Sequence, residues 1–380
     1  MVESRNIKYI SSVDHIRAYA AILIVLYHGI ELIHQLSSDK KNSQWPVSSK
    51  NPLKSFIIEG KTAVSLFMVL SGFIFTYGNN GEQIEYFRFL YNRILRIYPL
   101  MITMMMIGIS VYPWRFSIEK LFGTLLPFQN INNSSLRLGE YTIVFWTIAV
   151  EFQFYLIFPY LNQFLYKKGL MRFSLMFVLT FIIRISAVVE GANSRDISYW
   201  TILGRLDQFM CGMVAAYLLK NFNIQNRMLV RLLPAGLIGI IISITIFHRM
   251  GGWNEIASWK IIWPIIEGSL WATFLIGYLT FFHQKDNIVL RFIANIGTIS
   301  YSMYLIHHFV AFHIAKRSLV ISLFKDLFLN AFFTSLILTL PLTMLISTLT
   351  YYLIEKPFLG MRKSYSSTNK ETVRPVIRVF

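Results

Sequence analysis

Long apolar runs alternate with short polar segments along most of the chain. A helix needs about 20 residues to cross the hydrocarbon core of a bilayer, and several of the runs approach that length. Ten runs can be marked, at residues 13–33, 62–77, 100–112, 142–164, 173–189, 201–219, 229–247, 261–282, 296–315 and 327–353. The pattern predicts an all-α fold, a polytopic transmembrane helix bundle of about ten spans with no soluble domain.

The last run ends near residue 353, and the chain after it is basic and polar. We expect residues 1–360 to form the membrane domain. Residues 361–380 should form a basic cytoplasmic tail that stays disordered, because it has too little apolar surface to offset the entropy of ordering.

The composition supports a membrane protein and argues against a nucleic-acid partner. Of the 380 residues, 55% are hydrophobic and only 14% are charged, which excludes an ordinary soluble domain. The net charge of +17 would suit nucleic-acid binding, but Lys and Arg lie mostly at the ends of the apolar runs, where they anchor helices. We therefore expect contacts with membrane lipids and no nucleic-acid partner.

The positive charges also predict an orientation. An even number of spans puts both termini on one side, together with residues 88–96, 167–172, 220–231 and 285–291. This side carries more Lys and Arg than the other, so we expect it to be cytoplasmic.

The first run carries ionisable side chains that a simple membrane anchor does not need. Arg17 and His28 are eleven positions apart, about three full helical turns, so they share one face about 16 Å apart along the axis. Asp14 precedes this pair and Glu31 follows it. Ionisable groups at bilayer depth indicate function. The alternative is that His28 lies at the membrane interface and Glu31 in water.

Two arginines follow the second run. Arg93 and Arg96 are three positions apart, so on a helix they share one face at the membrane edge. A pair of guanidinium groups suits a phosphate-rich ligand, because each offers a planar fork of donors. Anchoring by the positive-inside rule explains them equally well.

Two further runs contain polar groups at depth. Glu151 lies near the centre of run 142–164 and must face protein or water, or else be protonated. Its alternative role is a structural ion pair. In run 296–315, Ser300, Tyr304 and His307 share a face. His307 and His308 are adjacent, but the metal-binding spacings are missing, so we expect no metal site.

Several of these segments together resemble the integral-membrane acyltransferase-3 family. Its first-span signature has Arg or Lys, ten residues, and then His, as in Arg17 to His28. The other matching segments, in chain order, are Leu66–Phe73, Arg93–Pro99, Trp146–Tyr155, Ser300–His307 and Glu355–Phe358. Two positions differ from many members: Asn92 stands in place of a third arginine, and Phe152 in place of a second acidic residue.

The resemblance implies transfer of an acyl group, usually acetyl from acetyl-CoA, to a hydroxyl of a saccharide. The acceptor would be a lipid-linked or polymeric envelope glycan, such as the O-antigen of lipopolysaccharide or an exopolysaccharide. The protein would then be a multi-pass protein of a bacterial inner (plasma) membrane. Neutral His28 is the natural general base for a hydroxyl, or it carries the acyl group itself.

The remaining candidates take supporting roles under the same resemblance. Asp14 or Glu31 would orient His28 or hold its charge, and Glu151 would be a second proton-handling or orienting group. Arg93 and Arg96 would bind the phosphates of CoA, with Arg17 between them and His28. Substrate binding is expected of Ser71, Tyr301 and His307, although helix packing explains these three almost as well.

Two other functions stay open. The same machinery could transfer succinyl or another acyl group instead of acetyl. A proton-coupled transporter could use His28, Glu31 and Glu151 as a proton relay. Against this second function, the sequence shows no clear internal repeat of the kind common in transporters.

Overall fold

The computed structural model describes residues 9–36, 45, 47–127, 130, 135–222, 225–283 and 285–366. Within these ranges the fold is helical, with one isolated antiparallel bridge between Ile84 and Ser366. The α-helices are α1 (Ser11–Gln35), α2 (Pro52–Ile58), α3 (Thr62–Asn79), α4 (Tyr86–Val111), α5 (Ile118–Leu125), α6 (Phe145–Val189), α7 (Ser194–Trp200), α8 (Ile202–Asn221), α9 (Asn226–Val230), α10 (Leu232–Arg249), α11 (Trp263–Phe281), α12 (Ile288–Thr298), α13 (Ser300–Lys316), α14 (Leu327–Thr334), α15 (Leu340–Thr350) and α16 (Lys356–Leu359).

Five short segments complete the element order. Three are 3-10 helices, η1 (Pro113–Arg115), η2 (Gly139–Tyr141) and η3 (Ser258–Ile261). Two are π-helical, η4 (Ser335–Thr339) and η5 (Tyr351–Glu355), and they join α14, α15 and α16 into one continuous apolar stretch.

The expected all-α membrane bundle is confirmed. Among the described residues, eight helices are long and apolar enough to cross a membrane, or nine if the pair α12–α13, bent by 69°, forms one span. The longest helix, α6, contains both expected runs 142–164 and 173–189. These two runs are separated by a break at Gly169, whose φ of 78° is outside the helical region. Because two of the ten expected runs fall in this one helix, the number of candidate spans is at most nine.

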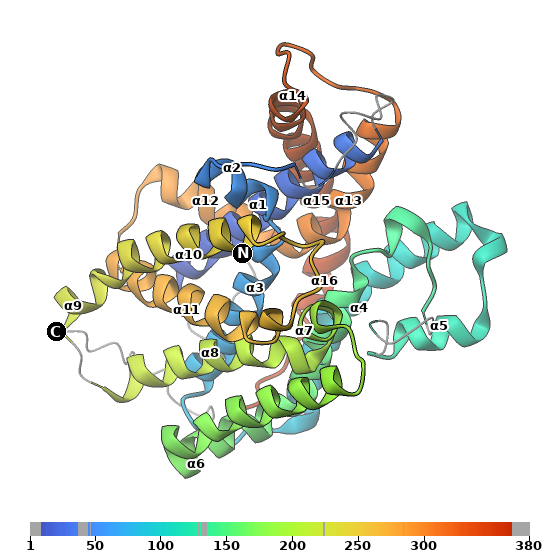
Figure 1. The fold of residues 1–380 in the computed structure, drawn as a ribbon. Helices are drawn as coiled ribbons and strands as arrows, with labels where there is room; N and C mark the ends of the chain where they lie inside the picture. The colour runs from blue at the N-terminus through green and yellow to red at the C-terminus, as the bar shows by residue number, and fades with distance from the viewer. Residues whose placement is uncertain are drawn as a thin grey trace.

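The helices pack in layers that Figure 1 shows clearly. Helices α10, α11, α8 and α6 lie side by side in that order, and α3 packs against α8. Helix α1 contacts α3, α12, α13 and α14. Close approach of α3 and α8 depends on Gly72 and Gly212, where an added Cβ would lie 2.0 Å and 1.9 Å from backbone oxygens of the facing helix.

The bundle has two chemically different ends. At one end, the start of α1 and the start of α4 meet the segment after α16, so that Arg17, Arg93 and Arg362 line one cavity. We call this the arginine end. At the other, which we call the histidine end, His28 near the end of α1 faces α13, and the Glu59–Lys61 turn before α3 lies nearby.

The beginning of the segment expected to be a tail packs against α4. Asn92 is fully buried, donates from Nδ2 to the Lys363 carbonyl at 2.7 Å, and accepts from the Lys363 amide at 2.8 Å. The Glu85 amide donates to the carbonyl of Tyr365, whose side chain is buried. Residues 361–366 therefore line the arginine end, whereas residues 367–380 lie outside the described ranges.

Candidate active site

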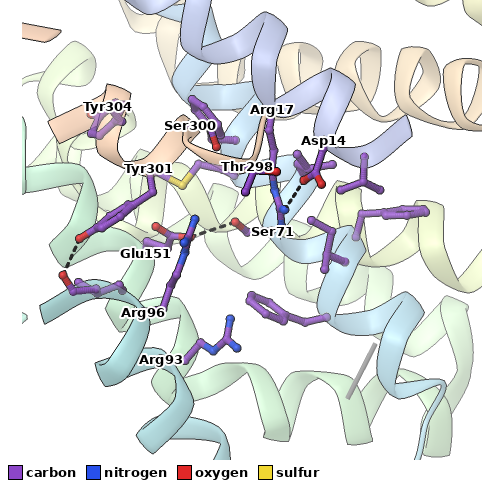
Figure 2. Close-up of a pocket in the computed structure, with 18 of the residues that line it drawn as sticks. Asp14, Arg17, Ser71, Arg93, Arg96, Glu151, Thr298, Ser300, Tyr301 and Tyr304 are labelled. Atoms are coloured by element: carbon purple, nitrogen blue, oxygen red, sulfur yellow. Dashed lines mark hydrogen bonds and ion pairs between the residues drawn. The ribbon is translucent and has the colours of Figure 1, made fainter. Parts of the chain in front are cut away.

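One large cavity at the arginine end gathers most of the predicted site residues. Its volume is about 290 Å³, and its walls come from α1, α3, α4, α6, α13 and the segment after α16. Figure 2 shows Asp14 and Arg17 of α1 facing the arginines of α4 across this space. Of the predicted side chains, seven line it: Asp14, Arg17, Ser71, Arg93, Arg96, Glu151 and Tyr301.

The two arginines of α4 are held differently. Arg96 donates from Nη1 to Glu355 Oε2 at 2.8 Å and lies 5.2 Å from the ring centroid of Tyr301. Glu355 belongs to the π-helical turn η5 and also accepts a hydrogen bond from Ser302. A π turn often marks a functional position, and here it brings this carboxylate to the arginine.

Arg93 has no ion-pair partner among the residues that the structure describes, and it lies against aromatic rings. Its guanidinium is 4.7 Å from the ring of Phe75 and 5.5 Å from that of Phe89. Its Nε is buried, with no hydrogen-bond partner among the described residues. A buried charged donor that lacks an acceptor favours an anionic ligand in the cavity.

Arg362 adds a third guanidinium beside this pair. Its side chain lines the same cavity, and the adjacent Lys363 is the residue that Asn92 fastens to α4. Burial, followed by repulsion from Arg93 and Arg96, lowers the pKa of Arg362 to about 10. Arg362 was not among the predicted site residues, because residues 361–380 were expected to form a disordered tail. No pattern in the sequence indicates that the chain folds back against α4 at this point.

Arg17 and Asp14 form a pair on the opposite wall. Arg17 Nη1 donates to Asp14 Oδ1 at 2.7 Å, one helical turn apart. Either Asp14 or Glu31 was expected to orient His28 or hold its charge. Asp14 lies fourteen residues from His28, about 21 Å along the helix. Of these two carboxylates, only Glu31 contacts that histidine.

Glu151 joins α6 to α3 inside the cavity. It accepts a hydrogen bond from Ser71 Oγ at 3.1 Å and a short one from the Tyr155 hydroxyl. Tyr301 donates to the Ile97 carbonyl at 2.7 Å and so connects α13 to α4. These contacts place Ser71 and Tyr301 in the cavity wall, and both also hold helices together.

His28 and Glu31 form a separate group near the other end of α1. His28 Nδ1 lies 2.8 Å from Glu31 Oε2, and neither side chain is fully buried, with exposures of 22% and 18%. An ionised carboxylate can only accept, so Nδ1 carries the proton and Nε2 has the basic lone pair. The pair is thus arranged as a base with an orienting partner.

Two histidines of α13 face His28. The ring centroid of His307 is 5.1 Å away and that of His308 is 5.4 Å away. His307 Nδ1 donates to the Tyr304 carbonyl at 2.7 Å, and its Nε2 is buried with no hydrogen-bond partner in the described part of the chain. We call His28, Glu31, His307 and His308 the histidine cluster. No grouping among the described residues has the geometry to hold a metal ion.

Tyr304 connects the histidine cluster to the cavity. Its side chain lines the cavity, its ring centroid is 5.6 Å from that of His307, and its hydroxyl accepts a hydrogen bond from Thr147 at 2.7 Å. The cavity and the histidine cluster are therefore neighbours, linked by the contact between Tyr304 and His307 and by the helices α1 and α13. His28, Glu31 and His307 do not line the cavity themselves.

Comparison with known proteins finds a family and several named relatives. The acyltransferase domain family (acyltransferase-3) matches residues 10–352. O-acetyltransferase OatA of Staphylococcus aureus strain NCTC 8325 is 23% identical over 346 residues, which cover 79% of this chain and 50% of that protein. The S. aureus strain COL protein named "Putative O-acetyltransferase SACOL0978" is 23% identical over 394 residues, covering 93% and 58%.

The chain spans about half the length of the curated relatives it matches first. No solved structure matches it. The family match covers every predicted site residue, from Asp14 to His307, and confirms the resemblance inferred from the motifs. With eight or nine candidate spans among its described residues, this membrane protein belongs to the acyltransferase-3 family.

Proposed function

We propose that this protein is a membrane O-acetyltransferase that moves an acetyl group from acetyl-CoA to a hydroxyl of a cell-envelope saccharide. One observation carries the proposal: Tyr304 lines a cavity with three arginines, and its ring contacts His307, a neighbour of the His28–Glu31 pair. Such a site can bind a phosphate-rich donor at one part and remove a hydroxyl proton at the other.

The arginine end suits the phosphates of CoA. Arg93, Arg96 and Arg362 line one wall, and Arg93 Nε lacks a partner there. Three neighbouring guanidinium groups repel one another, so an anion between them would relieve that repulsion. The volume of about 290 Å³ lies at the lower limit of ordinary ligand pockets. Acetyl-CoA supplies the acetyl thioester.

The histidine pair supports the acceptor half of the reaction. His28 Nε2 would take the proton of the attacking hydroxyl, and Glu31, 2.8 Å from Nδ1, would stabilise the positive charge that develops on the ring. Glu151, with Ser71 and Tyr155, would fix the geometry of the cavity between the two parts.

The proposed orientation follows from charge. The segments richest in Lys and Arg meet at the arginine end, so we place this end and both termini in the cytoplasm of a bacterial inner membrane. The histidine end then faces the opposite side. On this arrangement the donor enters from the cytoplasm, and the saccharide, an O-antigen, an exopolysaccharide or a similar glycan, approaches from the other side.

The test is CoA release from acetyl-CoA by purified protein in detergent, with a membrane glycolipid extract as acceptor. We expect wild type to release CoA and to form esters that mild alkali removes. His28→Ala, still folded, should lose at least about 10²-fold in rate. Succinyl-CoA in a parallel assay tests the choice of acyl group. If wild type releases no CoA with any extract, the enzyme proposal fails.

A further inference from the structure

A second, smaller cavity lies at the histidine end, outside the site described above. Its volume is about 40 Å³, and its walls come from the turn before α3 and from α7, α8, α10, α11 and the loops between them. The charged side chains that line it are Glu59, Lys61, Arg195, Arg205, Lys260 and Glu267. The four basic groups outnumber the two carboxylates, so the second cavity carries excess positive charge.

Both carboxylates already have partners. Glu267 Oε2 accepts from Ser65 Oγ at 2.7 Å and from Gln208 Nε2 at 3.1 Å. Glu59 pairs with Lys61 at 2.9 Å and with His248 Nδ1 at 3.0 Å. Glu59 Oε2 accepts no hydrogen bond from a described residue, and its contact with Lys61 is an ion pair.

Arg205 is a buried donor in the same wall. Its exposure is 1%, its Nε donates to the Tyr199 carbonyl at 2.8 Å, and its Nη1 donates to Ser65 and Gln208. Its Nη2 is buried and has no partner among the described residues. The hydroxyl of Ser198, also in the cavity wall, is likewise buried and unpartnered.

An unpaired guanidinium donor and an unpaired hydroxyl in one cavity are costly unless an acceptor joins them. Leaving a buried charged donor unsatisfied costs several times more than a typical hydrogen bond contributes. Lys61 lines the same cavity, with its ammonium group 4.3 Å from the ring of Trp253. These three groups can donate together to one anionic group, phosphate or carboxylate.

The second cavity adjoins the histidine cluster. Gly60, next to Lys61, packs so closely on Tyr27 that an added Cβ would lie 2.7 Å from the tyrosine Cβ. Tyr27 directly precedes His28 and donates to Glu31 at 3.4 Å. The second cavity and the histidine cluster are therefore joined through the Gly60–Tyr27 contact.

The second cavity has aromatic rings in and behind its wall. Ring centroids of Tyr199 and Trp253 lie 4.4 Å apart, and Trp146 lies 5.0 Å from Tyr199. Aromatic faces carry negative charge density and attract the polarised C–H groups of a sugar ring. The surroundings therefore suit a saccharide that bears an anionic substituent better than a free inorganic ion.

We propose that the second cavity holds a phosphate or carboxylate group of the acceptor saccharide, bound by Arg205, Lys61 and Ser198. The acceptor is then an anionic saccharide, whose hydroxyl lies at His28 while its anionic group occupies the second cavity. This assignment of substrate class rests on the proposed O-acetyl transfer, although binding of the anion can be measured without it.

The test measures binding and transfer separately on the purified full-length protein. Binding of glucose, glucuronate and glucose 1-phosphate is followed by tryptophan fluorescence at constant ionic strength, which holds screening fixed. The variants are Arg205→Gln and Ser198→Ala. The matched control is Arg249→Gln, because Arg249 lies at the end of α10, donates to the Lys50 carbonyl and does not line the second cavity.

We expect wild type to bind at least one anionic sugar more tightly than glucose. Arg205→Gln should weaken that binding about 10- to 100-fold, as expected for one hydrogen bond to a charged group. Ser198→Ala should weaken it less, and Arg249→Gln should not change it. Glucuronate and glucose 1-phosphate distinguish carboxylate from phosphate.

Two results would overturn the assignment: equal affinity for glucose and both anionic sugars, or anion binding that Arg205→Gln and Ser198→Ala leave unchanged. Ser198→Ala removes only one hydroxyl, so it keeps the test decisive if Arg205→Gln does not fold. If anion binding depends on Arg205 but acetyl-CoA is never consumed, the anion site is supported and the proposed transfer alone fails.

Discussion

The arginine-lined cavity and the histidine cluster share helix α1 and are built in opposite ways. The cavity assembles guanidinium groups from distant parts of the chain, with Arg17 near one terminus and Arg362 near the other. The histidine cluster begins with a local pair one helical turn apart, His28 and Glu31, and adds two neighbours from α13.

The difference reflects the two tasks we assign to these regions. Binding several phosphate oxygens requires excess positive charge around a sizeable space, and no short segment can surround a space by itself. Proton transfer requires one lone pair held in a fixed direction, and a side chain one turn away supplies that orientation. Substitutions in the two regions should therefore change different kinetic constants.

The largest effect is expected at the histidine cluster. His28→Ala should lower kcat by about 10²- to 10⁴-fold, because the general base is lost, and should leave the KM for acetyl-CoA nearly unchanged. Steady-state CoA release measures both constants. His313→Ala is the control, since His313 lies on α13 but contacts Glu140 and Phe309 instead. Equal losses in both variants would contradict the assignment of His28.

Arg96→Ala should reduce stability more than any other arginine change in the cavity. Glu355 is 1% exposed and would be left buried without its partner, at a cost of about 3–5 kcal/mol. Thermal unfolding in detergent measures the loss. The double variant Arg96→Ala with Glu355→Gln should recover most of the stability and retain a raised KM for acetyl-CoA. If the double variant is no more stable than the single one, the broken ion pair is not the cause of the lost stability.

Arg93→Ala should have the opposite profile to His28→Ala. It should raise the KM for acetyl-CoA about 10- to 100-fold, the value of one or two charged hydrogen bonds, with little change in kcat. Stability should change little, because no described carboxylate loses a partner. Arg88→Ala is a matched control on the same helix, with its guanidinium paired to Glu85 outside the cavity. A fall in kcat without a change in KM would contradict the donor assignment.

Glu31→Gln should reduce kcat about tenfold. The neutral amide keeps the shape of the side chain but loses the charge-assisted hydrogen bond to His28 Nδ1, worth roughly 1.5 kcal/mol. Asp14→Asn is the informative comparison, because Asp14 pairs with Arg17 and does not contact His28. If Asp14→Asn lowered kcat more than Glu31→Gln, the orienting role of Glu31 would be wrong.

The smallest effect is expected at Asn92. Asn92→Ala removes two hydrogen bonds to Lys363, each worth about 1 kcal/mol, and so loosens the segment that carries Arg362. We expect the KM for acetyl-CoA to rise about threefold, because Arg362 would be partly displaced. We also expect trypsin to cleave this segment faster. Arg362→Gln should raise the same KM without the faster cleavage at Lys363. An unchanged KM in both variants would exclude Arg362 from donor binding.

The amino-acid sequence by itself determined the fold class, the family and seven of the side chains that line the cavity. Spans follow from apolar length, and the shared face of Arg17 and His28 follows from helical geometry. The same periodicity put Arg93 and Arg96 together, and both line the cavity. Such features are local, because helix geometry relates residues a few turns apart whatever surrounds them.

Only the tertiary structure decided which of these residues meet. It brought His307 and His308 to His28, placed Arg362 in the same cavity as Arg93, and built the second cavity around Arg205. These contacts join segments up to hundreds of residues apart. They depend on how whole helices pack, through close approaches such as that at Gly72, and no periodicity along the chain encodes them.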